Sequence, residues 1–187
     1  MPILAKEQDV YPLDLLDRYA TGEMSDQQWY AMYTMSCREK ELMRRLRAMD
    51  IAHCTPLIAR RTHSPQGRIR TSHVPLFSSY VFVCGNDFHR YDALTTNCVS
   101  RDLPVADGLQ FATDLRRIKQ LIDLGHPLTP ERRMSTGTPV RVLSGPFRNF
   151  EGMVIRRENE TRLLVALRFM QQGASVRLDE CQLELLG

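Results

Sequence analysis

Several features that mark common classes of protein are missing from this sequence of 187 residues. No apolar run approaches the ~20 residues that a bilayer crossing needs, and residues 1–28 lack the pattern of a signal peptide. We therefore expect a cytoplasmic protein with no membrane partner. With 43% hydrophobic and 25% charged residues, the chain is not of a disordered or low-complexity class. Its length suits one large domain or two small ones.

The motifs of the main enzyme and metal classes are also absent. There is no Walker loop, G-x-G-x-x-G, G-x-S-x-G or H-E-x-x-H motif. The five cysteines include no C-x-x-C pair, and most have apolar neighbours, so we expect all five to be structural. His63 and His73 can approach each other across a hairpin, but no nearby carboxylate completes a metal site. We expect no catalytic residue, no metal and no cofactor, and therefore a protein that is not an enzyme.

Acidic residues are missing from one long stretch of the chain. The net charge of +3 is divided unevenly: residues 1–28 hold two basic and six acidic residues, 29–125 hold 14 and nine, and 126–187 hold nine and seven. Residues 51–86 contain no Asp or Glu. The centre of this stretch holds Arg60, Arg61, Arg68 and Arg70. Such a cluster suits nucleic-acid phosphate, and the alternative is solvated surface charge. The absence of acids favours the nucleic-acid interpretation.

Local patterns predict mixed helix and strand between residues 29 and 125. Apolar periodicity, the capping box Ser36 to Glu39 and the turn Ser64-Pro65-Gln66-Gly67 are the main signals. The predicted elements are a strand at 29–35, a helix at 37–50, a basic hairpin of 53–62 and 68–76, a strand at 80–84, a short helix capped by Asn86 or Asp87 and bearing Phe88, Tyr91 and Leu94, a strand at 98–103, and a helix at 113–124 capped by Thr113.

The rest of the chain predicts strands alone. Residues 126–136 carry two prolines and mixed charge without apolar periodicity, and Gly137 follows them, which indicates a linker. Turn signals then separate short strands at 139–143, 152–156, 162–169 and 175–178, a pattern typical of a small β-barrel. Before the first strand, an acidic extension at 1–28 holds Leu13, Leu15, Leu16 and Tyr19, which can form a short amphipathic piece; a disordered tail is the alternative.

Two further groups are open to two interpretations from the residues alone. One is an aromatic set, for which composition favours a core over a binding surface: Trp29, Tyr30, Tyr33, Tyr80 and Phe82. The loop 145–152, with Phe147 and Phe150, suits a structural turn and a partner-binding loop equally well. The residues alone thus predict a two-domain cytosolic binding module.

Read in order, these segments resemble the NusG family of transcription elongation factors and its specialised paralogs such as RfaH. The first half of the resemblance lies in Trp29-Tyr30-Ala31-Met32-Tyr33 and in the stretch Pro75 to Val83. The second half is a KOW signature, Gly137-x-x-Val140-Arg141-Val142-Leu143-x-Gly145-Pro146-Phe147 followed by Gly152-x-Val154. The ordered pair with a linker between them is more specific than either motif alone.

The resemblance implies an α+β fold. It implies an N-terminal α/β sandwich with an antiparallel sheet at 29–125, a linker at 126–136, and a five-stranded, Src-homology-3-like KOW β-barrel at 137–187, after the extension at 1–28. The alternation in Val140-Arg141-Val142 favours stable strands over a helical hairpin in this second part.

The resemblance also implies partners. Tyr33, Tyr80 and Phe82 match the family's surface for the clamp helices of RNA polymerase, and His89 matches a contact with the opposite pincer. The four hairpin arginines would lie near upstream or non-template DNA. The KOW domain would recruit Rho or a small-subunit ribosomal protein, and the candidate contacts there are Phe147, Phe150 and Met170.

One departure from the family pattern bears on function. The family's Phe-Gly-Arg in the late barrel loop aligns with Met170-Gln171-Gln172, which lacks the aromatic anchor expected of a Rho contact. The resemblance therefore favours a specialised antitermination factor that suppresses pausing or termination. The alternative is a KOW-type protein that binds the ribosome or RNA through the basic hairpin.

Overall fold

The computed structural model describes residues 6–134, 136–179 and 182–187. The chain divides into two compact units, Met1–Gly108 and Leu109–Gly187. The division falls earlier in the chain than the linker expected at 126–136. Among the described residues, no helix has the length and apolar character that a membrane crossing requires.

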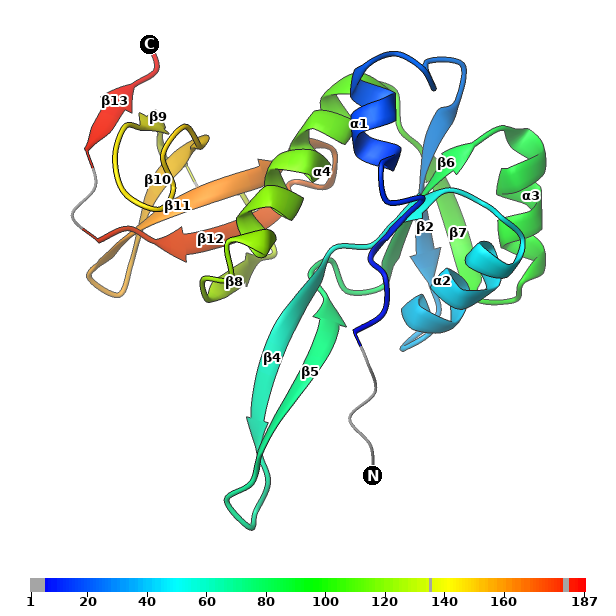
Figure 1. Cartoon of the computed structure of the whole chain (residues 1–187), viewed down its shortest axis with the longest axis horizontal. Helices are drawn as coiled ribbons and strands as arrows, with labels where there is room; N and C mark the ends of the chain where they lie inside the picture. Colours follow the sequence, from blue (N-terminus) through cyan, green and yellow to red (C-terminus); the bar gives the residue numbers. More distant parts are fainter. Residues whose placement is uncertain (1–5, 135, 180–181) are drawn as a thin grey trace. The chain divides into compact units, whose positions relative to one another are not determined.

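The first unit is built on a five-stranded antiparallel sheet in the order β1-β3-β6-β2-β7, with a separate two-stranded sheet β4-β5 (Figure 1). The expected strands, hairpin and helices of residues 29–103 are all confirmed within a few residues. In chain order the elements are β1 (Val10–Tyr11), α1 (Leu15–Ala20), β2 (Gln28–Thr34), α2 (Glu39–Ala48), β3 (His53–Cys54), β4 (Leu57–His63), β5 (Ile69–Pro75), β6 (Tyr80–Gly85), α3 (Asp87–Thr95) and β7 (Val99–Pro104).

Helix α2 covers one face of this sheet. Its residues Leu42 and Leu46 are fully buried in a core that includes Met32 of β2 and Val81 of β6. The predicted capping box at its start is wrong: the N-cap is Arg38, without a side-chain cap, and the Glu39 carboxylate instead accepts a hydrogen bond from the backbone N–H of Ser79 at 2.7 Å. That bond ties the start of α2 to the turn that leads into β6.

The acidic N-terminal segment, described from residue 6, forms part of the first unit. Strand β1 pairs with β3 at the edge of the sheet. Leu15 and Tyr19 of α1 are buried, and the Tyr19 ring packs on Trp29 with centroids 5.6 Å apart, while Leu13 is exposed. Strand β2 therefore has buried residues on both faces, since consecutive residues of a strand point to opposite sides.

The second unit contains a six-stranded antiparallel sheet in the order β13-β9-β10-β11-β12-β8. The sheet has six strands where five were expected, because residues of the expected linker form β8. In the described part of the chain, no pairing joins the edge strands β13 and β8, so a closed barrel is not seen. The elements are α4 (Gly108–Asp123), which starts earlier than expected and not at Thr113, β8 (Leu128–Glu131), β9 (Thr138–Val142), β10 (Glu151–Arg157), β11 (Glu160–Leu167), the short 3₁₀ helix η1 (Arg168–Met170), β12 (Gln172–Arg177) and β13 (Leu183–Leu185).

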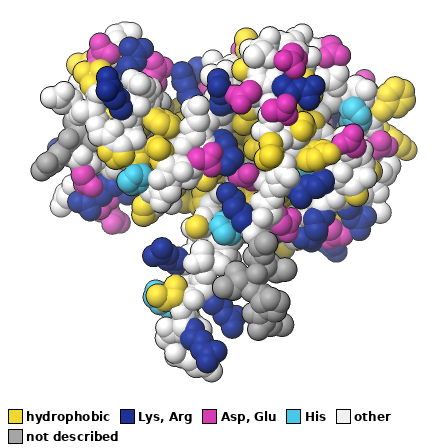
Figure 2. All heavy atoms as spheres, in the orientation of Figure 1, with side chains coloured by type: hydrophobic (Ala, Val, Ile, Leu, Met, Phe, Trp, Pro, Cys, Tyr) yellow, Lys and Arg dark blue, Asp and Glu magenta, His cyan; other side chains and the backbone are white. Residues whose placement is uncertain are grey.

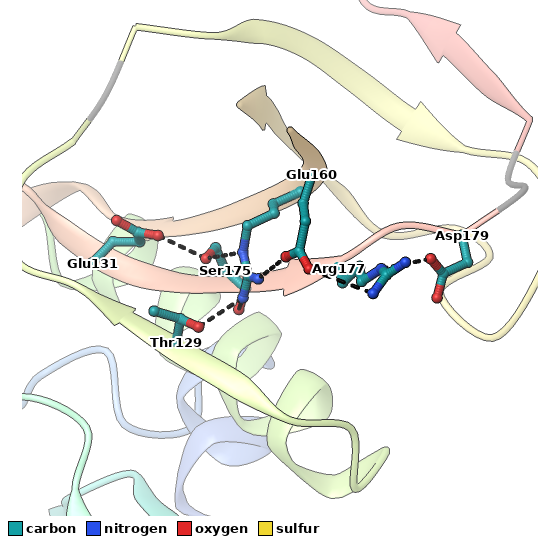
Figure 3. Close-up of polar contacts among 7 residues, drawn as sticks. Thr129, Glu131, Glu160, Ser175, Arg177 and Asp179 are labelled. Carbon is teal, nitrogen blue, oxygen red and sulfur yellow. Dashed lines mark hydrogen bonds and ion pairs between the residues drawn. The ribbon is translucent and has the colours of Figure 1, made fainter. Parts of the chain in front are cut away.

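A polar network joins β8, β11 and β12 (Figure 3). The Arg162 side chain, only 12% exposed, donates to the hydroxyl oxygens of Ser175 (2.9 Å) and Thr129 (2.7 Å) and to the Glu160 carboxylate (2.9 Å). Ser175 in turn donates to Glu131 at 2.7 Å. Strand β8 is thus attached to β12 by side chains as well as by the backbone ladder.

The cysteines follow the expected structural role only in part. Cys54, Cys84 and Cys98 are buried, whereas Cys37 is exposed, and Cys181 lies outside the described residues. Burial raises the pKa of the Cys84 thiol to about 12, which keeps it protonated and unreactive. Within the described ranges, no group of three or more His, Cys, Asp or Glu is arranged to hold a metal ion.

Candidate interaction surfaces

Tyr33 and Tyr80 lie together at one end of the main sheet of the first unit. They are directly opposite each other on β2 and β6, so their side chains share a face. Their ring centroids are 5.2 Å apart in an edge-on arrangement, and both residues are half-buried. An aromatic pair that keeps part of its surface in solvent is suited to a protein contact, because tyrosine is enriched among the residues that dominate interfaces.

Phe82 does not share this exposure. It lies two residues after Tyr80 on the same face of β6, and its ring stacks near that of Tyr80 with centroids 6.4 Å apart. Phe77 packs against its other side, with centroids 5.7 Å apart, and Phe82 is fully buried. This corrects the expectation that Phe82 belongs to an exposed surface. It is a core residue whose ring packs against Tyr80.

Arg101 extends the tyrosine pair and was missed in the sequence. It lies on β7 directly opposite Tyr33 of β2, so Arg101, Tyr33 and Tyr80 form a row across three strands. The Arg101 guanidinium lies 5.0 Å from the centroid of the Tyr33 ring, and Arg101 is exposed. The pairing of β2 with β7 contains a register shift, and no local pattern in the sequence reveals it.

His89 lies elsewhere on the first unit. It is at the third position of α3, where its ring Nδ1 accepts from the Asn86 N–H (3.3 Å) and its own N–H donates to the Asn86 side chain (3.0 Å). This confirms Asn86 as the cap. Strand β6 separates His89 from Tyr80 by roughly 15–20 Å at ~3.3 Å per residue, so the structure does not bring these two candidates together.

The four arginines of the acid-free stretch all lie on or next to the hairpin β4-β5. Arg60 and Arg61 are on β4, Arg70 is on β5, and Arg68 follows the turn. The expected turn is confirmed: the Gly67 N–H donates to the Ser64 carbonyl at 2.9 Å, and Gly67 has a positive φ of 76°. In the view of Figure 2, basic side chains stand along the projecting hairpin.

These arginines form no ion pair within the part of the chain that the structure describes. All four are exposed. Their charge is therefore not neutralised within the described part of the protein. Unpaired guanidinium groups on a protruding ribbon are suited to bidentate contacts with phosphate.

The candidate contacts of the second unit separate into different environments. Phe147 is 3% exposed and its ring packs against His126, with centroids 4.9 Å apart, so it belongs to the core. Phe150 is half-buried and lines a groove of about 500 Å³. Met170 is half-buried on η1. The remaining residues that line the groove are Arg117, Gln120, Asp123 and Leu124 from α4, and Arg148, Asn149 and Glu151.

An aromatic residue does stand beside the late loop of the second unit. Phe169, next to Met170, is 38% exposed, and its ring meets that of Phe111 edge-on with centroids 5.7 Å apart. Phe169 was not among the residues expected from the resemblance, because the family's Phe-Gly-Arg aligns with Met170-Gln171-Gln172. The loop therefore keeps an accessible aromatic ring, displaced by one residue.

Comparison with protein families identifies one segment of the chain. Residues 27–103 match the NusG family model, described as transcription termination factor nusG. The matched segment holds the tyrosine row and the hairpin. No curated protein sequence matches the chain.

Two solved structures are similar to most of the chain at low identity. One is a structure of Thermotoga maritima NusG, with 21% identity, a TM-score of 0.45, and coverage of 86% of this chain and 98% of that chain. Another is the MjSpt4:Spt5 complex in conformation B, with 15% identity, a TM-score of 0.29, and coverage of 84% and 97%.

Proposed function

We propose that this protein is a transcription elongation and antitermination factor that binds RNA polymerase through its first unit and so suppresses pausing or termination. The observation that carries the proposal is the NusG-family match over residues 27–103. The matched residues include both surfaces that are proposed here as contacts, the tyrosine row and the basic hairpin. A cytoplasmic location follows from such a function.

Tyr33 and Tyr80, with Arg101 beside them, are the proposed contacts for the clamp helices of the polymerase. The two rings are held in place by each other and by the fully buried Phe82 beneath Tyr80. A preordered aromatic pair loses little conformational entropy when it binds, which favours its use as an anchor. His89, which lies apart from this row, is proposed as a separate contact with the opposite pincer.

The hairpin arginines are proposed to contact DNA close to the polymerase. Arg60, Arg61, Arg68 and Arg70 supply unpaired positive charge on a ribbon that stands away from the main sheet (Figure 1). Each phosphate contact releases condensed counterions, so this part of the binding will weaken as salt concentration rises.

The second unit is proposed to act as a KOW module that recruits a further partner, either Rho or a small-subunit ribosomal protein. Phe150 in the groove and Phe169 and Met170 on η1 are the accessible candidates, whereas the buried Phe147 is a structural residue. The presence of Phe169 beside the late loop supplies the aromatic anchor that the sequence motif alone does not show.

The polymerase contact is tested by the double substitution Tyr33→Ala and Tyr80→Ala in the full chain. If the two rings anchor the interface, co-purification with core RNA polymerase will fall by at least about tenfold, because losing one or two such anchors costs ~2 kcal/mol or more. Tyr91→Ala is the matched control, since Tyr91 is 66% exposed on α3 and outside the row. Retained binding of the double variant with folded structure would falsify the surface assignment.

One observation keeps a second function in view. The unpaired hairpin arginines suit ribosomal RNA as well as DNA, which is the role expected of a KOW-type ribosome- or RNA-binding protein. Sedimentation of the protein with ribosomes, in preference to polymerase, from a lysate that contains both would select this alternative.

A further inference from the structure

The hairpin β4-β5 carries positive charge on both of its faces. Residues directly opposite each other in an antiparallel pair share a face, and neighbours along a strand point to opposite faces. Arg60 pairs with Ser72 and Thr62 pairs with Arg70, which places Arg60 and Arg70 on one face. Arg61 pairs with Thr71 and lies on the other face, together with His63 and His73.

Both faces are accessible. The hairpin forms its own two-stranded sheet, and all residues from Ala59 to His63 and from Arg68 to Ser72 are exposed. A ribbon that lies flat on a nucleic acid uses the charges of one face only, and the charges of the other face then point to solvent. Arginines on both faces are instead suited to a groove, where phosphates stand on either side of the ribbon.

The size and chemistry of the ribbon fit one groove in particular. The major groove of B-DNA, ~12 Å wide, admits a two-stranded β-ribbon without deformation of the duplex, whereas proteins that enter the ~6 Å minor groove commonly bend or kink the DNA. Each strand has seven residues, which at ~3.3 Å per residue gives a ribbon of roughly 23 Å. Gln66 at the tip and Arg68 beside it carry the donors that read base edges in that groove.

The hairpin lacks the features that other nucleic acids require. Single strands are bound largely by stacking of bases on aromatic rings, and residues 57–75 contain no Phe, Tyr or Trp. The major groove of duplex RNA is too deep and narrow for side chains to read. The lack of aromatic residues and the shape of the RNA major groove favour duplex DNA as the ligand of an inserted ribbon.

We propose that the hairpin β4-β5 enters the major groove of duplex DNA, with Arg60 and Arg70 on one face and Arg61 on the other contacting phosphates on opposite sides of the groove. The proposal rests on the nucleic-acid role within the proposed function and specifies its ligand. It does not depend on polymerase, so it is tested on the free, full-length protein and fails separately from the tyrosine contact.

The first experiment measures binding of the full chain to a fluorescein-labelled DNA duplex of 20 base pairs, about two helical turns, by anisotropy in a series of salt concentrations. Arg61→Ala will lower the slope of log affinity against log salt by ~0.9, and Arg60→Ala with Arg70→Ala by ~1.8, because each contact neutralises one phosphate. Arg156→Ala, which removes an exposed arginine of the second unit, is the control and will leave the slope unchanged. An effect confined to one face would show flat binding and overturn the proposal.

The second experiment identifies the groove and the nucleic acid. Methyl green, which occupies the major groove, will displace the protein from an A·T-containing duplex, and netropsin, which occupies the minor groove, will not. The labelled single strand and an RNA duplex of the same sequence will bind more weakly than the DNA duplex at equal salt. Competition by netropsin alone, or equal or tighter binding of the single strand or the RNA duplex, contradicts insertion into the major groove.

Discussion

Arginine has different roles on the hairpin of the first unit and in the second unit. In the second unit Arg117, Arg141, Arg157, Arg162 and Arg177 each bind a carboxylate. On the hairpin of the first unit, Arg60, Arg61, Arg68 and Arg70 bind none among the described residues. The residue type is the same, so the difference comes from the distribution of acids, which are absent from residues 51–86 and interspersed with arginine after residue 130.

The comparison shows how to separate structural charge from charge available to a partner. A paired arginine has its hydrogen-bonding capacity satisfied within the fold, as when Arg141 binds Glu151 and lowers the pKa of that carboxyl. An arginine that forms no ion pair within the fold is available to bind an anionic group of another molecule. The net charge of +3 does not distinguish the two roles, whereas the position of the acids along the chain does.

The largest expected effect is on the stability of fragments of the second unit. Thr129 and Glu131 of the polar network lie on β8, and Asp114 of α4 accepts a hydrogen bond from the Arg168 N–H at 3.1 Å. We therefore expect residues 109–187 to fold alone, and residues 137–187, which lack both β8 and α4, to lose cooperative unfolding. Thermal unfolding followed by circular dichroism will measure this. Residues 126–187, which keep β8 but not α4, are the control for the two contributions; a cooperative transition of the 137–187 fragment equal to that of 109–187 would show that neither element is needed.

The strand β8 illustrates what the sequence does not reveal. Residues 126–136 contain Pro127 and Pro130, which predict a linker, yet β8 includes Pro130. The strand is at the edge of its sheet, and there proline is tolerated because its missing N–H need not join a ladder. The strands β1 and β13 were not predicted for a different reason: two or three residues are too few to show an alternating pattern.

Long elements with clear periodicity, in contrast, were predictable. The helix α2, the hairpin and its turn, the strand β6 and the Asn86 cap all follow from local residue patterns. For the candidate sites, the sequence located the tyrosines and the arginines but not the burial of Phe82, since burial depends on neighbours distant in sequence. Arg101 was missed because it meets Tyr33 only through strand pairing.

The second prediction compares one arginine of each role directly. Arg162→Ala removes a largely buried guanidinium from Ser175, Thr129 and Glu160, and should destabilise the protein by ~3 kcal/mol, because the remaining polar groups lose their partner. Arg61→Ala should change stability by less than ~0.5 kcal/mol, since the side chain is exposed and unpaired. Urea unfolding of both variants measures the difference; similar losses would contradict the division into structural and available arginines.

The third prediction concerns His53, a cation-forming residue that lies in the same acid-free stretch as the hairpin but inside the fold. It is fully buried, its ring Nδ1 lies 2.9 Å from the Ile51 carbonyl oxygen, and it stacks on Tyr11 with centroids 5.8 Å apart. Burial lowers the pKa of His53 to about 4, from about 6.5 when unfolded, and the nearby charge of Arg47 acts in the same direction. The ring is therefore neutral in the folded protein at neutral pH.

The sign of the pH effect follows from this difference. Below about pH 6.5 the unfolded chain binds a proton at His53 that the folded chain does not, so stability falls as the pH drops and stops falling below about pH 4. Between pH 7 and pH 5 the loss should be about 2 kcal/mol. Urea unfolding at the two values measures it, and His53→Phe, which keeps a ring against Tyr11, should remove most of this loss. An equal loss of stability in His53→Phe would mean that groups other than His53 set the acid sensitivity.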